Sequence, residues 1–182
     1  ASQSLIRRDD GPGDPEVEQP RFTMLETIRS FASHQLVMAG EEAIVMHHHA
    51  ALFRSLTARS AGELIGPRER ETVDLLDGEC QNLRAALVWL EEHEPSVGVE
   101  MAADLWLFWY RTGRVAEGEG WLRRGLVQCP DGPAAVRGKA LFVWGALAAV
   151  RGEFAFAEAR LLGAVALLND GPDITSLALA ET

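Results

Sequence analysis

The sequence predicts an all-α protein built from stacked helical hairpins, with one short β-hairpin at its amino-terminal end. Three observations support this fold class. Apolar residues recur at helical spacing through most of residues 25–168. Glycines at Gly40, Gly113 and Gly152 fall where these apolar patterns stop, as expected at helix ends. Only the first 24 residues contain short apolar runs separated by a stretch rich in Pro, Gly and acidic residues.

The stretch at residues 97–126 predicts a buried helical hairpin at the centre of the chain. Its first half is apolar on nearly all sides, so neighbouring helices must cover more than one of its faces. The pattern stops at Gly113, and a second amphipathic run follows after a short break, which favours antiparallel packing. The small Gly118 is expected to let the second helix approach the aromatic residues of the first. These aromatic residues are Trp106, Phe108, Trp109 and Tyr110.

A second hairpin at residues 134–168 repeats the same pattern. When Gly113 and Gly152 are aligned, large and small residues of the two copies match a tetratricopeptide frame. The two glycines are 39 residues apart, because the linker at residues 130–133 lengthens the usual repeat of about 34 residues. We therefore expect a tetratricopeptide-like array, truncated within a further helix at residues 174–180. Unrelated hairpins in an ordinary helical bundle are the alternative.

The first half of the chain predicts two strands and three helices. Residues 4–7 and 21–24 are expected to pair as strands, with a loose acidic loop at residues 9–20 between them. Helices are expected at residues 25–39, from Glu41 or Glu42 to about Arg59, and at residues 73–90. Gly78 is expected to kink or divide the third helix. The apolar seam of that helix is Val73, Leu76, Cys80, Leu83, Leu87 and Leu90.

Composition and charge exclude several classes of function. With 182 residues, 47% of them hydrophobic, the chain can form a substantial core. It contains no uncharged apolar run of about 18 residues, so we expect a soluble, cytoplasmic protein without a membrane segment. A net charge of −10 opposes direct binding to nucleic acid. Cys80 and Cys129 are expected to be free, buried thiols.

No motif for catalysis or for a cofactor is present. The sequence lacks a phosphate-binding loop, a dinucleotide fingerprint, a nucleophile elbow and the paired histidines of a metalloprotease. The consecutive histidines His47, His48 and His49 point about 100° apart on a helix, so they cannot converge on one metal ion. We therefore expect no enzyme activity, no metal and no cofactor in this segment.

Three blocks of the sequence resemble a known family. RFTMLETIRSFASHQL at residues 21–36, ECQNLRAALVWL at 79–90 and LWLFWYRTGRVAEGEGWLRRGL at 105–126 are similar to a group of bacterial signal-transduction ATPases. In these transcriptional regulators an NB-ARC-like nucleotide-binding module is followed by a winged helix and then by tetratricopeptide-like repeats. Many also carry a LuxR-type helix-turn-helix or a cyclase domain.

The resemblance implies a regulatory segment without chemistry of its own. Residues 1–24 would be the last strands of a winged helix, residues 25–96 a helical linker bundle and residues 97–182 the repeats. ATP would bind only in the nucleotide-binding domain, which these residues do not contain. The partners would be a protein or peptide, or other domains of the same regulator, and the oligomeric state stays open. A scaffold or adaptor in a kinase-linked or cyclase-linked signalling protein is the alternative.

The tetratricopeptide frame also predicts a partner-binding groove. The first helix of each repeat lines the concave surface of such an array, where aromatic rings and cations suit a peptide with an acidic end. The alternative is that Leu107 and Phe142 only pack against each other or against further repeats. The candidate groove residues are Leu107, Tyr110, Arg111, Lys139 and Phe142, with Glu100, Ala103, Ala146 and Ala149 beside them.

Overall fold

The computed structural model describes residues 6–9 and 21–169 and confirms the helical class. The chain forms two compact units, Ala1–Met46 and His47–Thr182, which are described separately below. Helix α2 contributes its residues from His47 onward to the second unit. The elements are β1 (Ile6–Asp9), β2 (Arg21–Met24), α1 (Glu26–Ala39), α2 (Glu42–Glu63), α3 (Glu69–Gly78), α4 (Cys80–His93), α5 (Pro95–Asp104), α6 (Trp106–Arg111), α7 (Val115–Gln128), α8 (Ala134–Val150) and α9 (Phe154–Asn169).

In the first unit, β1 and β2 pair antiparallel, with Ile6 opposite Met24 and Asp9 opposite Arg21. The sequence placed Asp9 in a loop, whereas it belongs to β1, because its partner Arg21 extends the pairing by one residue. Residues 4 and 5 of the expected first strand and residues 10–20 of the expected loop lie outside the described residues. Helix α1 ends at Gly40, which adopts the left-handed conformation that the sequence predicted for a helix stop.

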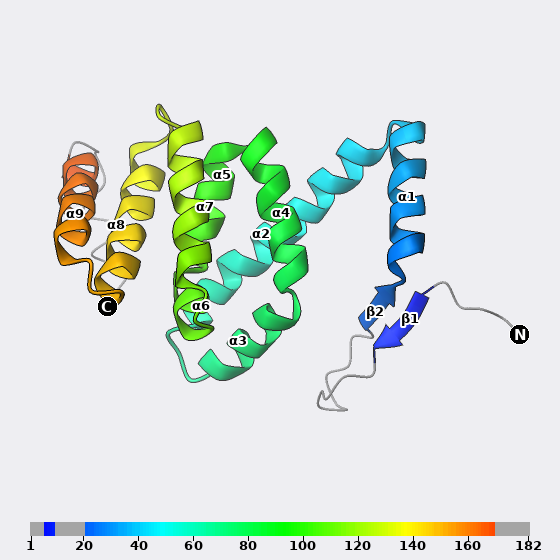
Figure 1. Cartoon of the computed structure of the whole chain (residues 1–182), viewed down its shortest axis with the longest axis horizontal. Helices are drawn as coiled ribbons and strands as arrows, with labels where there is room; N and C mark the ends of the chain where they lie inside the picture. The colour runs from blue at the N-terminus through cyan, green and yellow to red at the C-terminus, as the bar shows by residue number, and fades with distance from the viewer. Residues whose placement is uncertain (1–5, 10–20, 170–182) are drawn as a thin grey trace, which may run out of the picture. The chain divides into compact units, whose positions relative to one another are not determined.

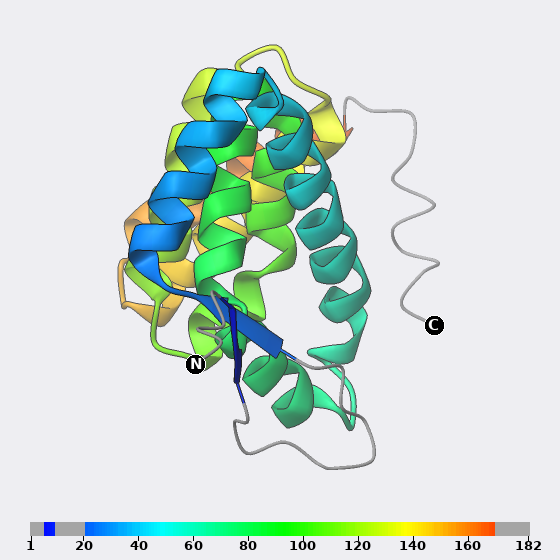
Figure 2. The ribbon, with the colours of Figure 1, turned by 90° about the vertical axis from the view of Figure 1, so that its right-hand side faces the viewer.

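The second unit is a row of helices whose axes run side by side. Helices α4, α5, α7, α8 and α9 follow one another across Figure 1, and the side view in Figure 2 shows their axes running along the same direction. Each helix contacts the next in this row, and α8 and α9 form the closest pair. The short helices α3 and α6 contact each other and lie below α4, α5 and α7 in Figure 1. The expected helix at residues 174–180 lies outside the described residues.

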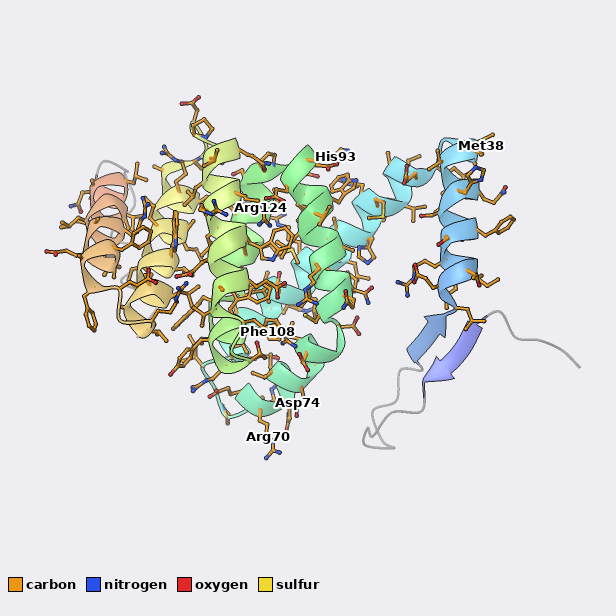
Figure 3. The ribbon with its side chains drawn as sticks, viewed as in Figure 1. Met38, Arg70, Asp74, His93, Phe108 and Arg124 are labelled. Carbon is orange, nitrogen blue, oxygen red and sulfur yellow. The ribbon has the colours of Figure 1, made fainter. Side chains whose placement is uncertain are left out.

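One hydrophobic core runs through the second unit from α2 to α8. The predicted seam of α3 and α4 lies in it: Leu76, Leu83 and Leu87 are almost fully buried. Gly78 ends α3 and α4 begins at Cys80, so the expected division of this helix is confirmed. Phe108 points into the core, whereas Arg70 and Asp74 project away from α3 into solvent (Figure 3). The core crosses the expected boundary between residues 96 and 97, and the predicted domain limits remain predictions.

The first helix of the central hairpin is divided, which the sequence did not predict. Helix α5 ends at Asp104 and α6 begins at Trp106, with Leu105 between them. The indole Nε1 of Trp109 donates a hydrogen bond of 3.1 Å to the carbonyl oxygen of Ala102. In an unbroken helix that oxygen would accept from the Trp106 amide, four residues later. The buried indole therefore stabilises the break by satisfying the carbonyl that the break would leave without a donor.

Two identical turns close the two predicted hairpins. Gly113 and Gly152 have φ angles of 72° and 81°, a left-handed conformation that glycine adopts without strain. The Arg114 amide donates to the Trp109 carbonyl at 2.8 Å, and the Glu153 amide donates to the Ala148 carbonyl at 3.0 Å. Each bond closes a six-residue turn, and the two turns lie 39 positions apart. The Glu41 amide donates to the Leu36 carbonyl at 2.9 Å in the same way at Gly40, so this turn is a general way of ending helices in this chain.

The expected close approach at Gly118 is confirmed. A Cβ atom built on Gly118 would lie 2.5 Å from Cδ1 of Trp109, which is far inside van der Waals contact. Gly125, two turns later on α7, faces Val99 in the same way. Glycine at these two positions thus lets α7 pack directly against α5 and α6.

Arginine–carboxylate pairs join neighbouring helices at the edges of the core. Arg84 of α4 donates two hydrogen bonds of 2.7 Å to the carboxylate of Glu117 on α7. This bidentate bond lowers the pKa of Glu117 and outweighs the opposing effect of burial. Arg124 of α7 bonds Glu91 at 2.6 Å, a second link between the same two helices. These pairs fix the relative position of α4 and α7.

Both cysteines are free and buried, as predicted. Burial also raises the pKa of the Cys80 thiol, with a smaller opposing effect of the Arg84 guanidinium. At neutral pH this residue therefore behaves as a small apolar side chain of the core.

Candidate functional site

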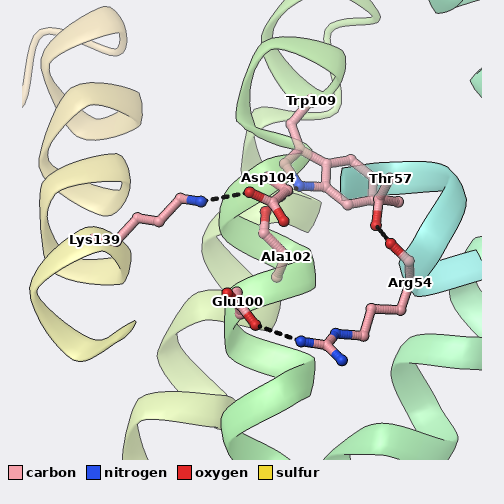
Figure 4. A network of polar contacts seen from close by, with 7 residues as sticks. All are labelled: Arg54, Thr57, Glu100, Ala102, Asp104, Trp109 and Lys139. Carbon is pink, nitrogen blue, oxygen red and sulfur yellow. Dashed lines mark hydrogen bonds and ion pairs between the residues drawn. The ribbon is translucent and has the colours of Figure 1, made fainter. Parts of the chain in front are cut away.

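The candidate site is organised on one face of α5. Glu100 and Asp104 lie four residues apart, so their carboxylates project from the same side of this helix. Arg54 of α2 donates to Oε2 of Glu100 at 3.1 Å, and Nζ of Lys139 on α8 bonds Oδ1 of Asp104. Figure 4 shows α5 between the two cations, with one carboxylate turned toward each neighbour. We call these four residues the α5 polar row.

Buried contacts hold the α5 polar row in place. The Trp109 indole bonds the Ala102 carbonyl on the same helix that carries Glu100 and Asp104. On α2, the buried hydroxyl of Thr57 donates to the Arg54 carbonyl at 2.8 Å. The Asp104 side chain is only 14% exposed, so its ion pair with Lys139 is partly shielded from water.

The predicted groove residues on α6 have different environments. Leu107 is buried in the core, with 9% of its surface exposed, and therefore offers little area to a partner. Tyr110 is 41% exposed. The Arg111 guanidinium lies 5.5 Å from the centre of the Tyr110 ring and bonds Glu69 of α3 at 2.5 Å. Tyr110 and Arg111 thus form a surface pair whose cation already has a carboxylate partner.

The predicted groove residues on α8 are Lys139 and Phe142. Lys139 is one of the two cations of the α5 polar row, and Phe142, one turn later, is 54% exposed. Within residues 21–169, no ring contact or ion pair joins the α6 pair to Lys139 or Phe142. Of the flanking residues, Ala103 was expected on this surface but is fully buried, because α5 is covered on several sides.

A cavity of about 420 Å³ adjoins the α5 polar row. It lies between α2, the carboxyl end of α4 and α5. Ala50, Ala51, Leu90 and Val97 form its apolar wall. Its polar lining includes His47, Arg54, Glu94, Glu100 and Asp104. Cavities of a few hundred Å³ with a few convergent polar groups are typical of ligand sites.

The three histidines do not form a metal site. His47 packs edge-on against Trp89, with ring centres 5.4 Å apart, and its Nδ1 lies 3.4 Å from the Glu94 carboxylate. His49 packs against Phe53 on another side of α2, and desolvation by burial lowers its pKa. In the part of the chain that the structure describes, no group of three or more His, Cys, Asp or Glu side chains could hold a metal ion.

Comparison with known proteins gives one relationship. Over 123 residues, 65% of this chain, it is 28% identical to proteins of Mycobacterium bovis and of two Mycobacterium tuberculosis strains. Each carries the name "Putative HTH-type transcriptional regulator". The match spans 13% of the length of these relatives. The chain is thus similar to a segment of proteins named as transcriptional regulators.

The other comparisons found nothing. No family model matches the chain, and no solved structure matches it. Within the described residues, none of the helices has the length and apolar character needed to cross a lipid bilayer.

Sequence reasoning missed most of the cavity and half of the α5 polar row. Arg54, Glu94 and Asp104 were not selected, because no motif and no predicted repeat position singles them out. The spacing of Glu100 and Asp104 by four residues was a usable signal, since it places two carboxylates on one helical face. Arg54 lies 46 residues away from Glu100, and no local pattern connects the two.

Proposed function

We propose that this chain is a non-catalytic regulatory segment of a cytoplasmic transcriptional regulator and acts by binding a protein or peptide. The similarity to proteins named as HTH-type transcriptional regulators, over 65% of the chain, is the observation that carries the proposal. The exposed aromatic residues Tyr110 and Phe142, with the cations Arg111 and Lys139 beside them, support a binding role.

We further propose that the parent regulator is a signal-transduction ATPase of the NB-ARC type. The three sequence blocks at residues 21–36, 79–90 and 105–126 support this assignment. In it, a partner bound to this segment changes the assembly state of an adjacent ATPase domain, and ATP binds only in that domain. Residues 1–24 would then complete a winged helix, residues 25–96 would form the linker bundle and residues 97–182 the repeats.

The two consecutive helical hairpins, whose turns at Gly113 and Gly152 are 39 residues apart, support a tetratricopeptide-like array within this proposal. Both turns have the same left-handed glycine and the same hydrogen bond across six residues. The α5–α6 and α8 helices would then be the first helices of consecutive repeats, with α7 and α9 as their second helices. The exposed rings of Tyr110 and Phe142 would belong to the surface that these first helices share.

Chromatin immunoprecipitation tests the regulatory role. An epitope tag is placed on the protein that carries this chain, in the organism that encodes it, and bound DNA is sequenced. We expect enrichment at discrete promoter regions, at least several-fold above an untagged strain, because a helix-turn-helix elsewhere in the parent would hold it on DNA. Coverage equal to that of the untagged strain would favour the scaffold alternative, a segment of a kinase-linked or cyclase-linked signalling protein.

A further inference from the structure

We propose that the cavity between α2, α4 and α5 binds a small organic cation, an ammonium or guanidinium compound with an apolar chain of about six carbons. This site would serve the regulatory role proposed above and depends on that proposal only for its biological meaning. The cavity and its charges are properties of the second unit alone, since every lining residue lies within residues 47–104.

The charge of the cavity lining favours a cation. Three carboxylates line it, those of Glu94, Glu100 and Asp104, against the one guanidinium of Arg54. Arg54 neutralises Glu100, and Lys139 neutralises Asp104 from outside the lining. The Glu94 carboxylate lies 3.4 Å from Nδ1 of the His47 imidazole, which carries a positive charge only when protonated. Glu94 is therefore the carboxylate that an incoming cation can pair with.

The net negative charge of the chain acts in the same direction. The helix dipoles do not, because Glu94 lies at the carboxyl end of α4 and at the amino end of α5, whose partial charges are opposite in sign. The net charge of −10 on the whole chain raises the local concentration of cations over that of anions. An anionic ligand would have to displace Glu100 from Arg54 in this field.

The shape and surface of the cavity set the apolar part of the ligand. Ala50 and Ala51 present only methyl groups, and this leaves the space between α2 and α5 open. Leu90 and Val97 add apolar surface beside the carboxylates. A chain of about six carbons would cover this apolar surface and gain free energy from its burial.

The test uses three probes of equal length and different charge: hexylammonium, hexanol and hexanoate. Each is titrated into the isotopically labelled 182-residue chain, and amide chemical shifts are followed by NMR. We expect hexylammonium to shift the amide signals of Ala50, Ala51 and Val97. It should bind at least about fivefold more tightly than hexanol, because its ammonium group forms one half-buried ion pair with Glu94. Hexanoate should bind more weakly than either.

Three variants complete the test. Glu94→Gln should weaken hexylammonium binding about fivefold. Its matched control, Glu92→Gln, removes the same charge from an exposed position of α4, two residues earlier, and should leave the affinity unchanged. Ala51→Leu fills the cavity from an exposed helical position and should abolish binding without unfolding α2.

Four results would each overturn the proposal: equal binding of hexanol and hexylammonium, tighter binding of hexanoate, equal effects of the Glu94 and Glu92 substitutions, or shifts confined to amides away from the cavity. Binding is measured on the chain alone, without DNA or transcription. A negative chromatin result would therefore leave this inference intact, and the absence of binding here would leave the regulatory proposal intact.

Discussion

Replacement of Trp109 by alanine is expected to lower the free energy of unfolding by about 3 to 5 kcal/mol. The Trp109 side chain is 0% exposed and lies at the centre of the second unit, so its removal leaves a large cavity. The substitution also removes the indole donor from the Ala102 carbonyl at the break between α5 and α6. Urea unfolding followed by far-ultraviolet circular dichroism measures the effect.

Tyr110→Ala provides the matched control for Trp109→Ala. Tyr110 is the next residue of the same helix, is also aromatic and is 41% exposed. Its replacement should cost about 1 kcal/mol or less, because much of the ring is already in contact with water. Equal losses of stability for the two variants would show that Trp109 does not hold the core together.

A pair of glycine substitutions on α7 is expected to change stability in opposite directions. Gly118→Ala should lower the free energy of unfolding by about 1 to 3 kcal/mol, because its Cβ would meet Cδ1 of Trp109 at 2.5 Å. Gly120→Ala, two residues later, should raise it by up to about 1 kcal/mol, because alanine favours the helix and the added Cβ would meet only the flexible end of Arg124, at 3.4 Å. Thermal unfolding of both variants measures the difference.

Gly118→Ala and Gly120→Ala control for each other, because both add one methyl group to the same helix. If Gly118→Ala were as stable as Gly120→Ala, α7 would not pack directly on Trp109. The close approach of the two helices in the central hairpin would then have to be abandoned.

Much of the helical architecture could be predicted because its signals are local. Gly40, Gly113 and Gly152 mark helix ends by their backbone conformation, and Gly78 marks a division between two helices. The apolar seam of α3 and α4 was predicted correctly because one helix face is buried along its length.

The features that escaped prediction depend on contacts between distant residues. The break at Leu105 is stabilised by the hydrogen bond from the Trp109 indole to a carbonyl oxygen of the preceding helix. The periodicity of apolar residues carries no information about this bond. The α5 polar row combines Arg54, Glu100, Asp104 and Lys139 from three helices. Each of these residues alone looks like an ordinary exposed charge, so only the packing of α2 and α8 on α5 reveals the row.

For the candidate groove, the repeat frame predicted more surface residues than the structure has. The repeat frame correctly places Tyr110 and Phe142 at the surface, but it also places Ala103 there, which the structure buries completely. A frame derived from regular repeats assumes one continuous first helix. In this chain that helix is divided at Leu105 and covered on several sides.

The central claim is that the surface carrying Tyr110, Arg111 and Lys139 controls a transcriptional regulator. The most direct measurement compares the transcripts of four strains: wild type, a deletion of the gene, a strain with Tyr110→Ala, Arg111→Glu and Lys139→Glu combined, and a control. The control carries Arg70→Glu and Arg123→Glu, two exposed cations without an ion pair in the described part of the chain. Circular dichroism first establishes that both variant proteins are folded. We predict that the triple variant changes the same transcripts as the deletion, whereas the control matches wild type. A folded triple variant with wild-type transcripts, in an organism where the deletion changes them, would contradict the account.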